Sequence, residues 1–304
     1  MKKEIGIVGL GKMGMGIAKQ LHEKGWRVIV TNRTPAKVDE AAQLGMIASY
    51  SYQEMISKFE STPRVVWLML PAGAPIEEAL FGNQGLSEFL DKGDTVVEAG
   101  NSFYKEDAPR AEKLSEKGIQ YIDVGVSGGP SGARNGACLM VGGSAEQFRK
   151  MEELYKDVSI KDGYAHFAGV GAGHFVKMVH NGIEYGMMQA IGEGFNVMKK
   201  SQFNLDLTEV ARIYNTGSVI ESRLVGWLHK AYTEWGEDLK TISGSISHSG
   251  EGKWTVETAK DLGEEVPVIA ESYQFRLDSE KKPSYTGQVV SALRGQFGGH
   301  AVKK

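Results

Sequence analysis

The sequence has few of the features that mark secreted or membrane proteins. Its 304 residues include a single cysteine, so no internal disulfide framework can form and the chain suits a reducing compartment. No apolar run approaches the length of a bilayer-spanning helix. The lysine-flanked apolar start, MKKEIGIVGLGKMG, is too short and too interrupted by glycine for a secretory signal. These absences predict a cytoplasmic protein, long enough for two domains.

Nucleic-acid and metal-binding classes lack support as well. The net charge is −3 at pH 7, and no basic run interleaved with aromatic residues is present, so we expect no nucleic-acid partner. Ligand spacings such as CxxC and HExxH are absent, so we expect no metal. The one cysteine, Cys138, lies in the apolar stretch ACLMV. We expect it to be a small buried side chain rather than a nucleophile.

A polar stripe on one predicted helix is the strongest functional signal. The stretch GHFVKMVHNGIEY covers residues 173–185. On a helix, positions i, i+3, i+4 and i+7 project from one face. Here these positions hold an amine, an imidazole, an amide and a carboxylate, namely Lys177, His180, Asn181 and Glu184. Such a stripe suits an acid–base site better than a core, and a solvated helix face with a Lys–Glu pair is the alternative.

The start of the chain has the pattern of a dinucleotide-binding unit. A short apolar strand, Ile5–Val8, runs into G-x-G-x-x-G and then into a helical pattern, and Trp26–Thr31 returns as a second strand. The glycines permit a tight turn and close approach to a pyrophosphate, which would sit at the positive end of the helix. A structural glycine turn is the alternative. The predicted cofactor contacts are Gly9, Leu10, Gly11, Lys12, Met13 and Gly14.

The end of the second strand bears on which nicotinamide cofactor binds. NAD-dependent enzymes usually place a carboxylate there for the ribose 2′-hydroxyl. This chain has Asn32, Arg33 and Thr34 instead. An arginine beside an amide and a hydroxyl can bind a 2′-phosphate through charge-assisted hydrogen bonds. The sequence therefore favours NADP, with NAD possible, unless Arg33 simply faces solvent.

Strand and helix patterns alternate as far as about residue 170, and helices alone follow. The further predicted strands each run into a polar, glycine-rich loop, where open α/β sheets bind ligands, and are Arg64–Leu70, Thr95–Val97, Gln120–Val124 and Ala137–Val141. The later helices are predicted at roughly 174–200, 207–216, 218–230, 253–262, 267–277 and 285–296. We therefore predict an α/β fold, with a Rossmann-type dinucleotide-binding domain over 1–173 and an all-helical domain over 174–304.

Five motifs together resemble the 6-phosphogluconate dehydrogenases. They are GHFVKMVHNGIEY, GVSGGPSGARNGACLMVGG, AGNS at 99–102, GKWT at 252–255 and RGQFGGH at 294–300. The resemblance covers nearly the whole chain and is to the short form, with one copy of a helical domain that longer members duplicate. It implies oxidation of 6-phosphogluconate by NADP and its decarboxylation to ribulose 5-phosphate without a metal. It leaves the host pathway open between pentose phosphate metabolism and gluconate catabolism.

The resemblance implies a role for each matching residue. Lys177 matches the general base that takes the C3 hydroxyl proton, and Glu184 matches the acid that protonates C1 of the enediol. Substrate-binding positions are matched by Asn101, Ser127, Gly128, Gly129, His180, Asn181, Tyr185, Arg276, Arg294 and His300. The last three match the phosphate end, where guanidinium groups and an imidazole can bind a phosphate. Further cofactor contacts are matched by Leu70, Pro71, Ala72 and Asn101.

The resemblance also implies a homodimer or homotetramer whose C-terminal arm completes the neighbouring site. Because the run at 295–299 is rich in glycine, we predict an extended arm, anchored by Phe297, rather than a helix. Arg294 and His300 would then act in the partner subunit's site.

One departure from the family pattern concerns the phosphate. Longer members carry a lysine at the position of Ser249 in this chain. Either the phosphate is held differently, by His248 or Lys253, or the preferred sugar acid differs. The loop Leu70–Ala72 also lacks a lysine that longer members often carry, which leaves its cofactor contacts open.

Two rival functions remain at this point. A 3-hydroxyisobutyrate-type dehydrogenase shares the fold and the lysine but does not decarboxylate, and it needs neither Glu184 nor the arginine–histidine tail. A sensor that binds NADP without turnover would have no use for the polar stripe. Release of CO2 from a phosphorylated substrate separates the first rival, and nicotinamide turnover separates the second.

Overall fold

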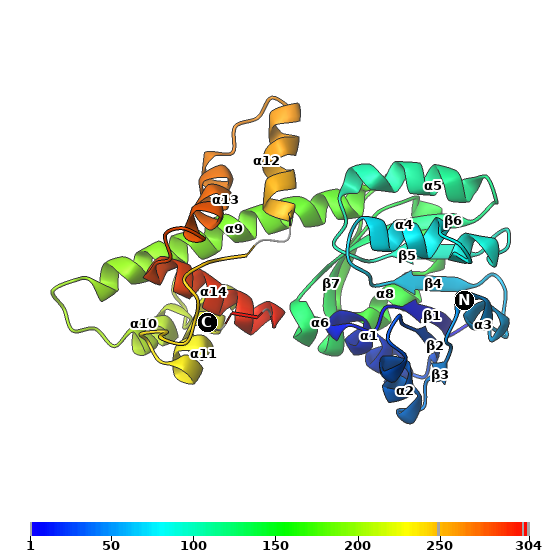
Figure 1. Cartoon of the computed structure of the whole chain (residues 1–304), viewed down its shortest axis with the longest axis horizontal. Helices are drawn as coiled ribbons and strands as arrows, with labels where there is room; N and C mark the ends of the chain where they lie inside the picture. The colour runs from blue at the N-terminus through cyan, green and yellow to red at the C-terminus, as the bar shows by residue number, and fades with distance from the viewer. Residues whose placement is uncertain (1, 248–249, 300, 303–304) are drawn as a thin grey trace. The chain divides into compact units, whose positions relative to one another are not determined.

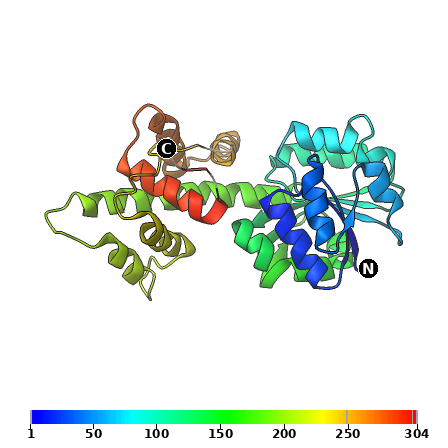
Figure 2. The ribbon, with the colours of Figure 1, turned by 60° about the horizontal axis from the view of Figure 1, so that its bottom comes forward.

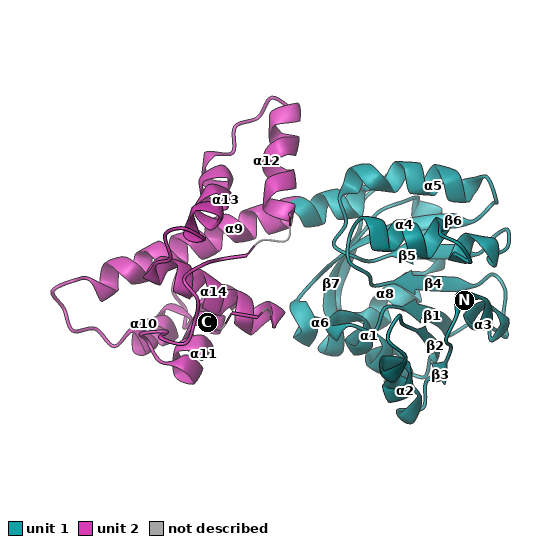
Figure 3. Ribbon diagram, viewed as in Figure 1, with its two compact units in different colours: residues 1–178 teal, residues 179–304 magenta. Residues whose placement is uncertain are grey.

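The computed structural model describes residues 2–247, 250–299 and 301–302. The chain divides into two compact units, Met1–Met178 and Val179–Lys304 (Figure 3). Unit 1 is an α/β unit with a single eight-stranded sheet, and the named elements of unit 2 are all helices, joined by loops, in its described residues. The predicted fold class is therefore confirmed. None of the described helices is long and apolar enough to cross a membrane.

The sheet of unit 1 has the strand order β3-β2-β1-β4-β5-β6-β7-β8. Strands β1 to β6 are parallel, β7 runs antiparallel to β6, and β8 is parallel to β7. Order 3-2-1-4-5-6 is that of a Rossmann fold, whose dinucleotides bind at the carboxyl ends of the strands, where the strand order reverses. The bounds are β1 Glu4–Val8, β2 Arg27–Thr31, β3 Ile47–Ala48, β4 Val65–Leu68, β5 Thr95–Glu98, β6 Gln120–Ser127, β7 Ala137–Val141 and β8 Ser159–His166.

Helices cover both faces of this sheet (Figures 1 and 2). Side chains alternate between faces along a strand, so Ile5, Ile7 and Trp67 enter one core with α1, while Val66 and Leu68 enter another with α4. The helix bounds are α1 Lys12–Glu23, α2 Pro35–Gln43, α3 Tyr52–Ser57, α4 Ala74–Phe81, α5 Asp107–Ser115, α6 Gly129–Asn135, α7 Ala145–Lys150 and α8 Glu152–Val158. Short 3-10 turns lie at Leu86–Glu88 and Tyr104–Glu106.

Unit 2 is built on the long helix α9, Ala172–Lys199, whose first turns belong to unit 1. The remaining helices are α10 Leu207–Tyr214, α11 Arg223–Trp235, α12 Glu251–Asp261, α13 Pro267–Ser279 and α14 Tyr285–Gly298. The core of unit 2 collects apolar side chains from α9, α10, α11 and α14, including Phe195, Leu228 and Leu293. Within this core, Phe195 packs edge to face with Tyr214 at a centroid distance of 6.1 Å.

Three local predictions were wrong. The residues after Val124 do not form a loop, because β6 continues to Ser127 in register with β7, and Gly129 begins α6. Because β7 runs antiparallel to β6, its carboxyl end lies beside Asp123 rather than at the edge where β1 to β6 end. Cys138 is exposed, since strand alternation turns it away from the core that Ala137 and Leu139 enter.

The predicted C-terminal arm was also wrong. Helix α14 continues through the glycine-rich run to Gly298 and ends at Gly299 in the left-handed conformation that favours glycine. A Cβ on Gly295 would lie 2.9 Å from Val302 and 3.0 Å from Trp235, so this glycine allows close packing rather than an extended arm. Phe297 packs on Trp227 of the same chain at a ring distance of 5.4 Å. Predictions for His248, Ser249 and His300 lie outside the described residues.

Candidate active site

The glycine loop after β1 is shaped by steric need. A Cβ on Gly9, whose φ is 94°, would lie 2.4 Å from the carbonyl oxygen of Met69, and one on Gly14 would lie 1.9 Å from the carbonyl oxygen of Gly9. Gly11 is different, because a Cβ there would meet nothing within 4 Å and the residue is exposed. Packing within the chain therefore does not require a glycine at position 11. A pyrophosphate that approaches the backbone at the start of α1 would require one, because a side chain there would stand in its way.

The carboxyl end of β2 supports this loop and exposes an arginine. Asn32 accepts a hydrogen bond from the backbone N–H of Leu10 at 2.9 Å and donates one to the carbonyl of Thr34 at 3.2 Å. Its amide therefore holds the glycine loop. Arg33 and Thr34 are exposed beside it. The residues that fit a dinucleotide are thus a braced glycine loop, a helix amino terminus and an exposed guanidinium.

The other predicted cofactor contacts follow strands of the same parallel set. Leu70, Pro71 and Ala72 come after β4, and Asn101 comes after β5. Because β1, β2, β4 and β5 are parallel neighbours in the sheet, these residues lie at the edge where the glycine loop lies. Pro71 and Asn101 are exposed there.

Lys177 lies near the start of α9 and packs against β6. It is 8% exposed. A Cβ on Gly125 of β6 would lie 2.4 Å from the Cβ of Lys177 and 2.9 Å from the carbonyl oxygen of Gly173. Only a glycine in the strand allows the lysine to lie so close. Two residues farther along β6, on the same sheet face, is Ser127, which is half-buried, as are Gly128 and Gly129 after it.

The other members of the polar stripe lie on the next turns of α9. The side-chain oxygen of Asn181 lies 2.9 Å from Nδ1 of His180, and a Glu184 carboxylate oxygen lies 3.8 Å from the same nitrogen. Asn181 is 8% exposed, while His180 and Glu184 remain part-exposed. An imidazole, an amide and a carboxylate therefore meet within unit 2. This combination of side chains is suited to proton exchange with a ligand.

Unit 2 also contains a buried cationic cluster. Arg276 is 2% exposed and stacks on the ring of Tyr185 at 3.2 Å. Arg294 is 5% exposed and donates to Ser247 at 2.7 Å. Burial lowers the pKa of Arg276 to about 10 and also lowers the pKa of Arg294. The Nη2 atom of Arg276 is buried and has no hydrogen-bond partner among the described residues.

This cluster has the chemistry of an anion site. Buried guanidinium groups are costly without an anion, and a phosphate accepts bidentate hydrogen bonds from them. Two nearby carboxylates, Glu184 and the buried Glu251, favour the charged form of both arginines. Both arginines are buried within unit 2. The role of Arg294 in a neighbouring subunit's site stays a prediction. Lys253, a predicted phosphate ligand, is half-exposed, and its ammonium lies 3.5 Å from Glu257.

Sequence reasoning missed a buried charged network behind Lys177. Nδ1 of His174 lies 2.8 and 3.0 Å from the two carboxylate oxygens of Asp107, and Nε2 lies 3.8 Å from Glu98. The donor atoms of Glu98, Asp107 and His174 lie close enough together to hold a metal ion. A guanidinium nitrogen of Arg110 lies only 3.6 Å from Glu98, however, and a second cation there would be repelled.

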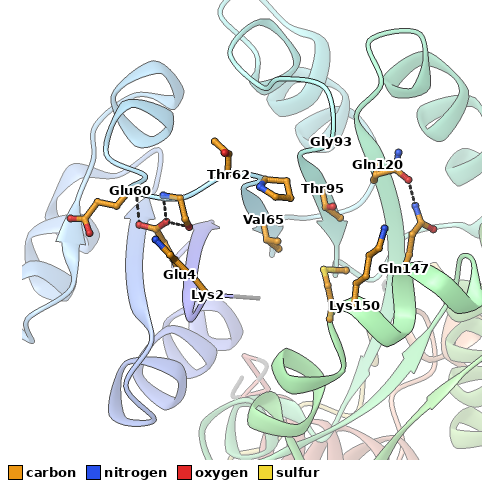
Figure 4. Close-up of a pocket in the computed structure, with 13 residues that line it drawn as sticks. Lys2, Glu4, Glu60, Thr62, Val65, Gly93, Thr95, Gln120, Gln147 and Lys150 are labelled. Carbon is orange, nitrogen blue, oxygen red and sulfur yellow. Dashed lines mark hydrogen bonds between the residues drawn. The ribbon is translucent and has the colours of Figure 1, made fainter.

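One cavity in the described part of unit 1 lies away from all of these residues. It has a volume of about 560 Å³ and is lined by the amino ends of four parallel strands, including Glu4, Val65, Thr95 and Gln120 (Figure 4). Dinucleotides bind at the opposite edge of such sheets. None of the predicted site residues lines it. The predicted cofactor contacts lie at the carboxyl edge of the sheet, and the polar stripe lies on α9.

The glycine loop, the Rossmann strand order and the helical second unit define a dinucleotide-dependent oxidoreductase. Family models bear this out: residues 4–165 match the NAD binding domain of 6-phosphogluconate dehydrogenase, and residues 173–296 match the C-terminal domain of the same enzyme. The chain belongs to the 6-phosphogluconate dehydrogenase family. Its cofactor is NADP or NAD.

Known proteins resemble this chain over nearly its whole length, and solved structures share its fold. The Bacillus subtilis protein YqeC, whose name assigns 6-phosphogluconate dehydrogenase activity only provisionally, is 47% identical over 99% of both chains. The NAD-dependent, decarboxylating enzyme of Haloferax volcanii is 35% identical over 99% of both. The 6-phosphogluconate dehydrogenase structure from Plasmodium falciparum has a TM-score of 0.83 at 29% identity, over 92% of this chain and 62% of that one. A 3-hydroxyisobutyrate dehydrogenase from Salmonella typhimurium shares the fold, with a TM-score of 0.75 at 20% identity, over 94% of this chain and 98% of that one.

Proposed function

We propose that this protein oxidises 6-phosphogluconate with NADP and decarboxylates the product to ribulose 5-phosphate and CO2. The observation that carries the proposal is the pair of buried arginines in unit 2, Arg276 and Arg294, one of them with an orphaned nitrogen. A phosphate would accept from the unpaired Nη2 of Arg276 and add to the compensation from Glu184 and Glu251, which a substrate without a phosphate could not do. This favours a phosphorylated sugar acid over a 3-hydroxyisobutyrate-type substrate.

The cofactor would be held by residues 1–173 and the substrate mainly by residues 174–304. The nicotinamide accepts a hydride from C3 of the sugar acid when it is bound. The contacts would come from the glycine loop, from Arg33 and Thr34 at the end of β2, and from the residues that follow β4 and β5. We assign NADP rather than NAD because Arg33 is exposed where a 2′-phosphate would lie, and its chain neighbours, Asn32 and Thr34, are not carboxylates.

Lys177 would act as the general base. Its neutral amine takes the proton of the C3 hydroxyl as the hydride leaves C3, and the resulting ammonium then polarises the C3 ketone. Loss of C1 as CO2 leaves an enediol. Glu184 would then protonate the carbon that becomes C1 of ribulose 5-phosphate. The seat of Lys177 against Gly125 supports this role, because a base must be held in place to act.

The substrate would be bound by the polar groups around these two residues. Asn101, Ser127, Gly128 and Gly129 would hold its carboxylate and hydroxyls, with His180 and Asn181 beside them. Tyr185, Arg276 and Arg294 would bind the phosphate, and His300 is assigned there by resemblance alone.

Unit 2 would also form a homodimer or homotetramer. Among the described residues, large apolar side chains that are exposed gather in this unit, with Val197, Phe203, Val219 and Val268 each at least 64% exposed. Association would bury such surface.

Initial rates measured with 6-phosphogluconate test the proposal. NADP and NAD are compared in parallel, CO2 is trapped, and ribulose 5-phosphate is assayed as product. Gluconate is the control substrate, since it lacks only the phosphate. We expect a kcat/KM for 6-phosphogluconate at least 100-fold above that for gluconate, with one CO2 per NADPH. Turnover of 3-hydroxyisobutyrate without CO2, or no nicotinamide reduction at all, would reject it.

A further inference from the structure

One face of β6 gathers the groups that fix the start of α9. Tyr121, Asp123, Gly125 and Ser127 alternate along the strand and share a face. Tyr121 donates to Asp107 of α5 at 2.7 Å, and Gly125 seats Lys177. Asp123 is fully buried between them and contacts the backbone at the start of α9.

Asp123 caps α9 from a distant strand. Its Oδ1 accepts the N–H of Gly171 at 2.8 Å, and its Oδ2 accepts the N–H of His174 at 3.0 Å. The first N–H groups of a helix have no partner within the helix, and a carboxylate is favoured there by the helix dipole. Burial raises the pKa of Asp123, and the charge of His174 and these two N–H groups act against that rise.

His174 adds a second attachment on the same turn. It is fully buried, and its ring is hydrogen-bonded to Asp107 at the start of α5. The charged and titratable groups that face it are Glu98 from β5, Asp107 and Arg110 from α5, and Tyr121 and Asp123 from β6. Burial alone would lower the pKa of His174, but Glu98 and Asp107 outweigh burial and raise the pKa to about 9. These carboxylates favour the charged form of the ring.

We propose that Asp123 and His174 are positioning residues for Lys177. His174 precedes the lysine by three residues, so both project from one side of the helix. Asp123 precedes Gly125 by two residues, so the carboxylate that holds the helix and the glycine that admits the lysine share one row. A shift of the first turn of α9 would therefore carry the amine of Lys177 with it. A positive and a negative charge shift the pKa of a nearby amine in opposite directions, so we expect the two variants to differ in the sign of their effect on Lys177.

This inference rests on the proposed role of Lys177 as the base. The test uses the full-length protein with saturating NADP and two conservative variants. Asp123→Asn keeps one acceptor oxygen but cannot accept from both N–H groups. His174→Asn keeps a donor for Asp107 near the Nδ1 position but removes the charge.

Asp94→Asn is a matched control in the same sheet. Asp94 is 1% exposed and accepts the backbone N–H groups of Arg64 at 2.6 Å and Asp91 at 2.9 Å. It therefore resembles Asp123 in burial and in the backbone groups that it satisfies. It lies before β5, at the amino edge of the sheet, away from α9.

The first measurement is the titration of Lys177 by NMR in lysine-labelled protein, with its signal assigned by its loss in Lys177→Met. Removing the positive charge of His174 should move the titration midpoint to higher pH, and removing the negative charge of Asp123 should move it lower, each by on the order of one pH unit. The control should keep its midpoint within about 0.2 pH unit of the wild type. A purely structural role would not produce shifts of opposite sign.

The second measurement separates kcat from KM. Both variants should lose about 10- to 100-fold in kcat, with KM for both substrates within about threefold, because a small misplacement of a base lowers the chemical step. The control should keep its kcat. Unchanged titration and kcat in both variants would overturn the positioning role, as would equal losses in Asp94→Asn.

Failure of the proposed function is distinguishable from failure of this inference. If the wild-type protein does not turn over 6-phosphogluconate while the lysine midpoint moves as stated, the function is wrong and the positioning role stands. If the wild-type protein is active and the lysine midpoint does not move in the variants, the positioning role is wrong and the proposed function stands. Should Asp123→Asn not fold, His174→Asn decides by the sign of its shift.

Discussion

Gly125→Ala tests the seat of Lys177 most simply. A Cβ at Gly125 would lie 2.4 Å from the Cβ of Lys177, 3.1 Å from its Cγ and 2.9 Å from the carbonyl oxygen of Gly173. Carbon atoms in good contact lie about 3.5–4.0 Å apart, so the start of α9 must move by roughly 1 Å. The obstacles are a backbone carbonyl and the base of a side chain, neither of which can swing aside.

The displacement should affect chemistry more than folding. Overpacking of this kind costs about 1–3 kcal/mol of stability. A misplacement of about 1 Å at a reacting group costs on the order of 100-fold in rate. We therefore expect kcat for 6-phosphogluconate to fall by on the order of 100-fold. NADP affinity should hold, because the glycine loop after β1 is untouched.

Steady-state rates, NADP binding by fluorescence and urea denaturation together provide the assay. Gly132→Ala is the matched control, because Gly132 lies in α6 and its Cβ would be 3.4 Å from the nearest atom, the carbonyl oxygen of Ser127. That is an ordinary contact, so this variant should keep its kcat. A folded Gly125→Ala protein with kcat within threefold of wild type, roughly 0.6 kcal/mol by the usual conversion, would refute the reasoning.

Three further predictions follow from the same sites. Glu184→Gln should lower turnover by about 100-fold or more with little change in substrate affinity, since the amide cannot donate as an acid; a collapse of affinity with intact turnover would make Glu184 a binding residue. Arg33→Ala should weaken NADP by about 10- to 100-fold and NAD far less; equal losses would exclude it as the discriminator. The pKa of His174 is about 9 in the fold against an ordinary 6.5, so its charged form should stabilise the fold by about 3 kcal/mol below pH 6.5, and this stabilisation should be lost as the pH rises through 9. Urea denaturation at several pH values should show that loss in the wild-type protein and not in His174→Asn.

Local patterns predicted the elements that depend on local sequence. The glycine loop, the strand Ala137–Val141 and the start of α10 at Leu207 are where periodicity and turn residues place them. The tail failed because glycine propensity favours an extended chain, while packing of Gly295 against Trp235 and Val302 favours a helix. Tertiary contacts overrode a local preference.

The candidate site divides in the same way. The polar stripe is a property of one helix, so its periodicity could be found without a structure. The network around His174 could not be, because its ring partner Asp107 is 67 residues away and its backbone partner Asp123 is 51 residues away. Each of these residues alone reads as an ordinary surface or turn residue. Only the sheet order and the start of α9 bring them together.

The most direct test of the whole account is the rate of Lys177→Met with saturating 6-phosphogluconate and NADP. NADP binding and the thermal midpoint are measured on the same preparation, so that loss of the base is separated from loss of the fold. We predict that NADP binds as in the wild-type protein while oxidation falls by about 100- to 10,000-fold, the range expected for loss of a general base. A folded variant that forms NADPH within tenfold of the wild-type rate, about 1.4 kcal/mol in activation free energy, would contradict it.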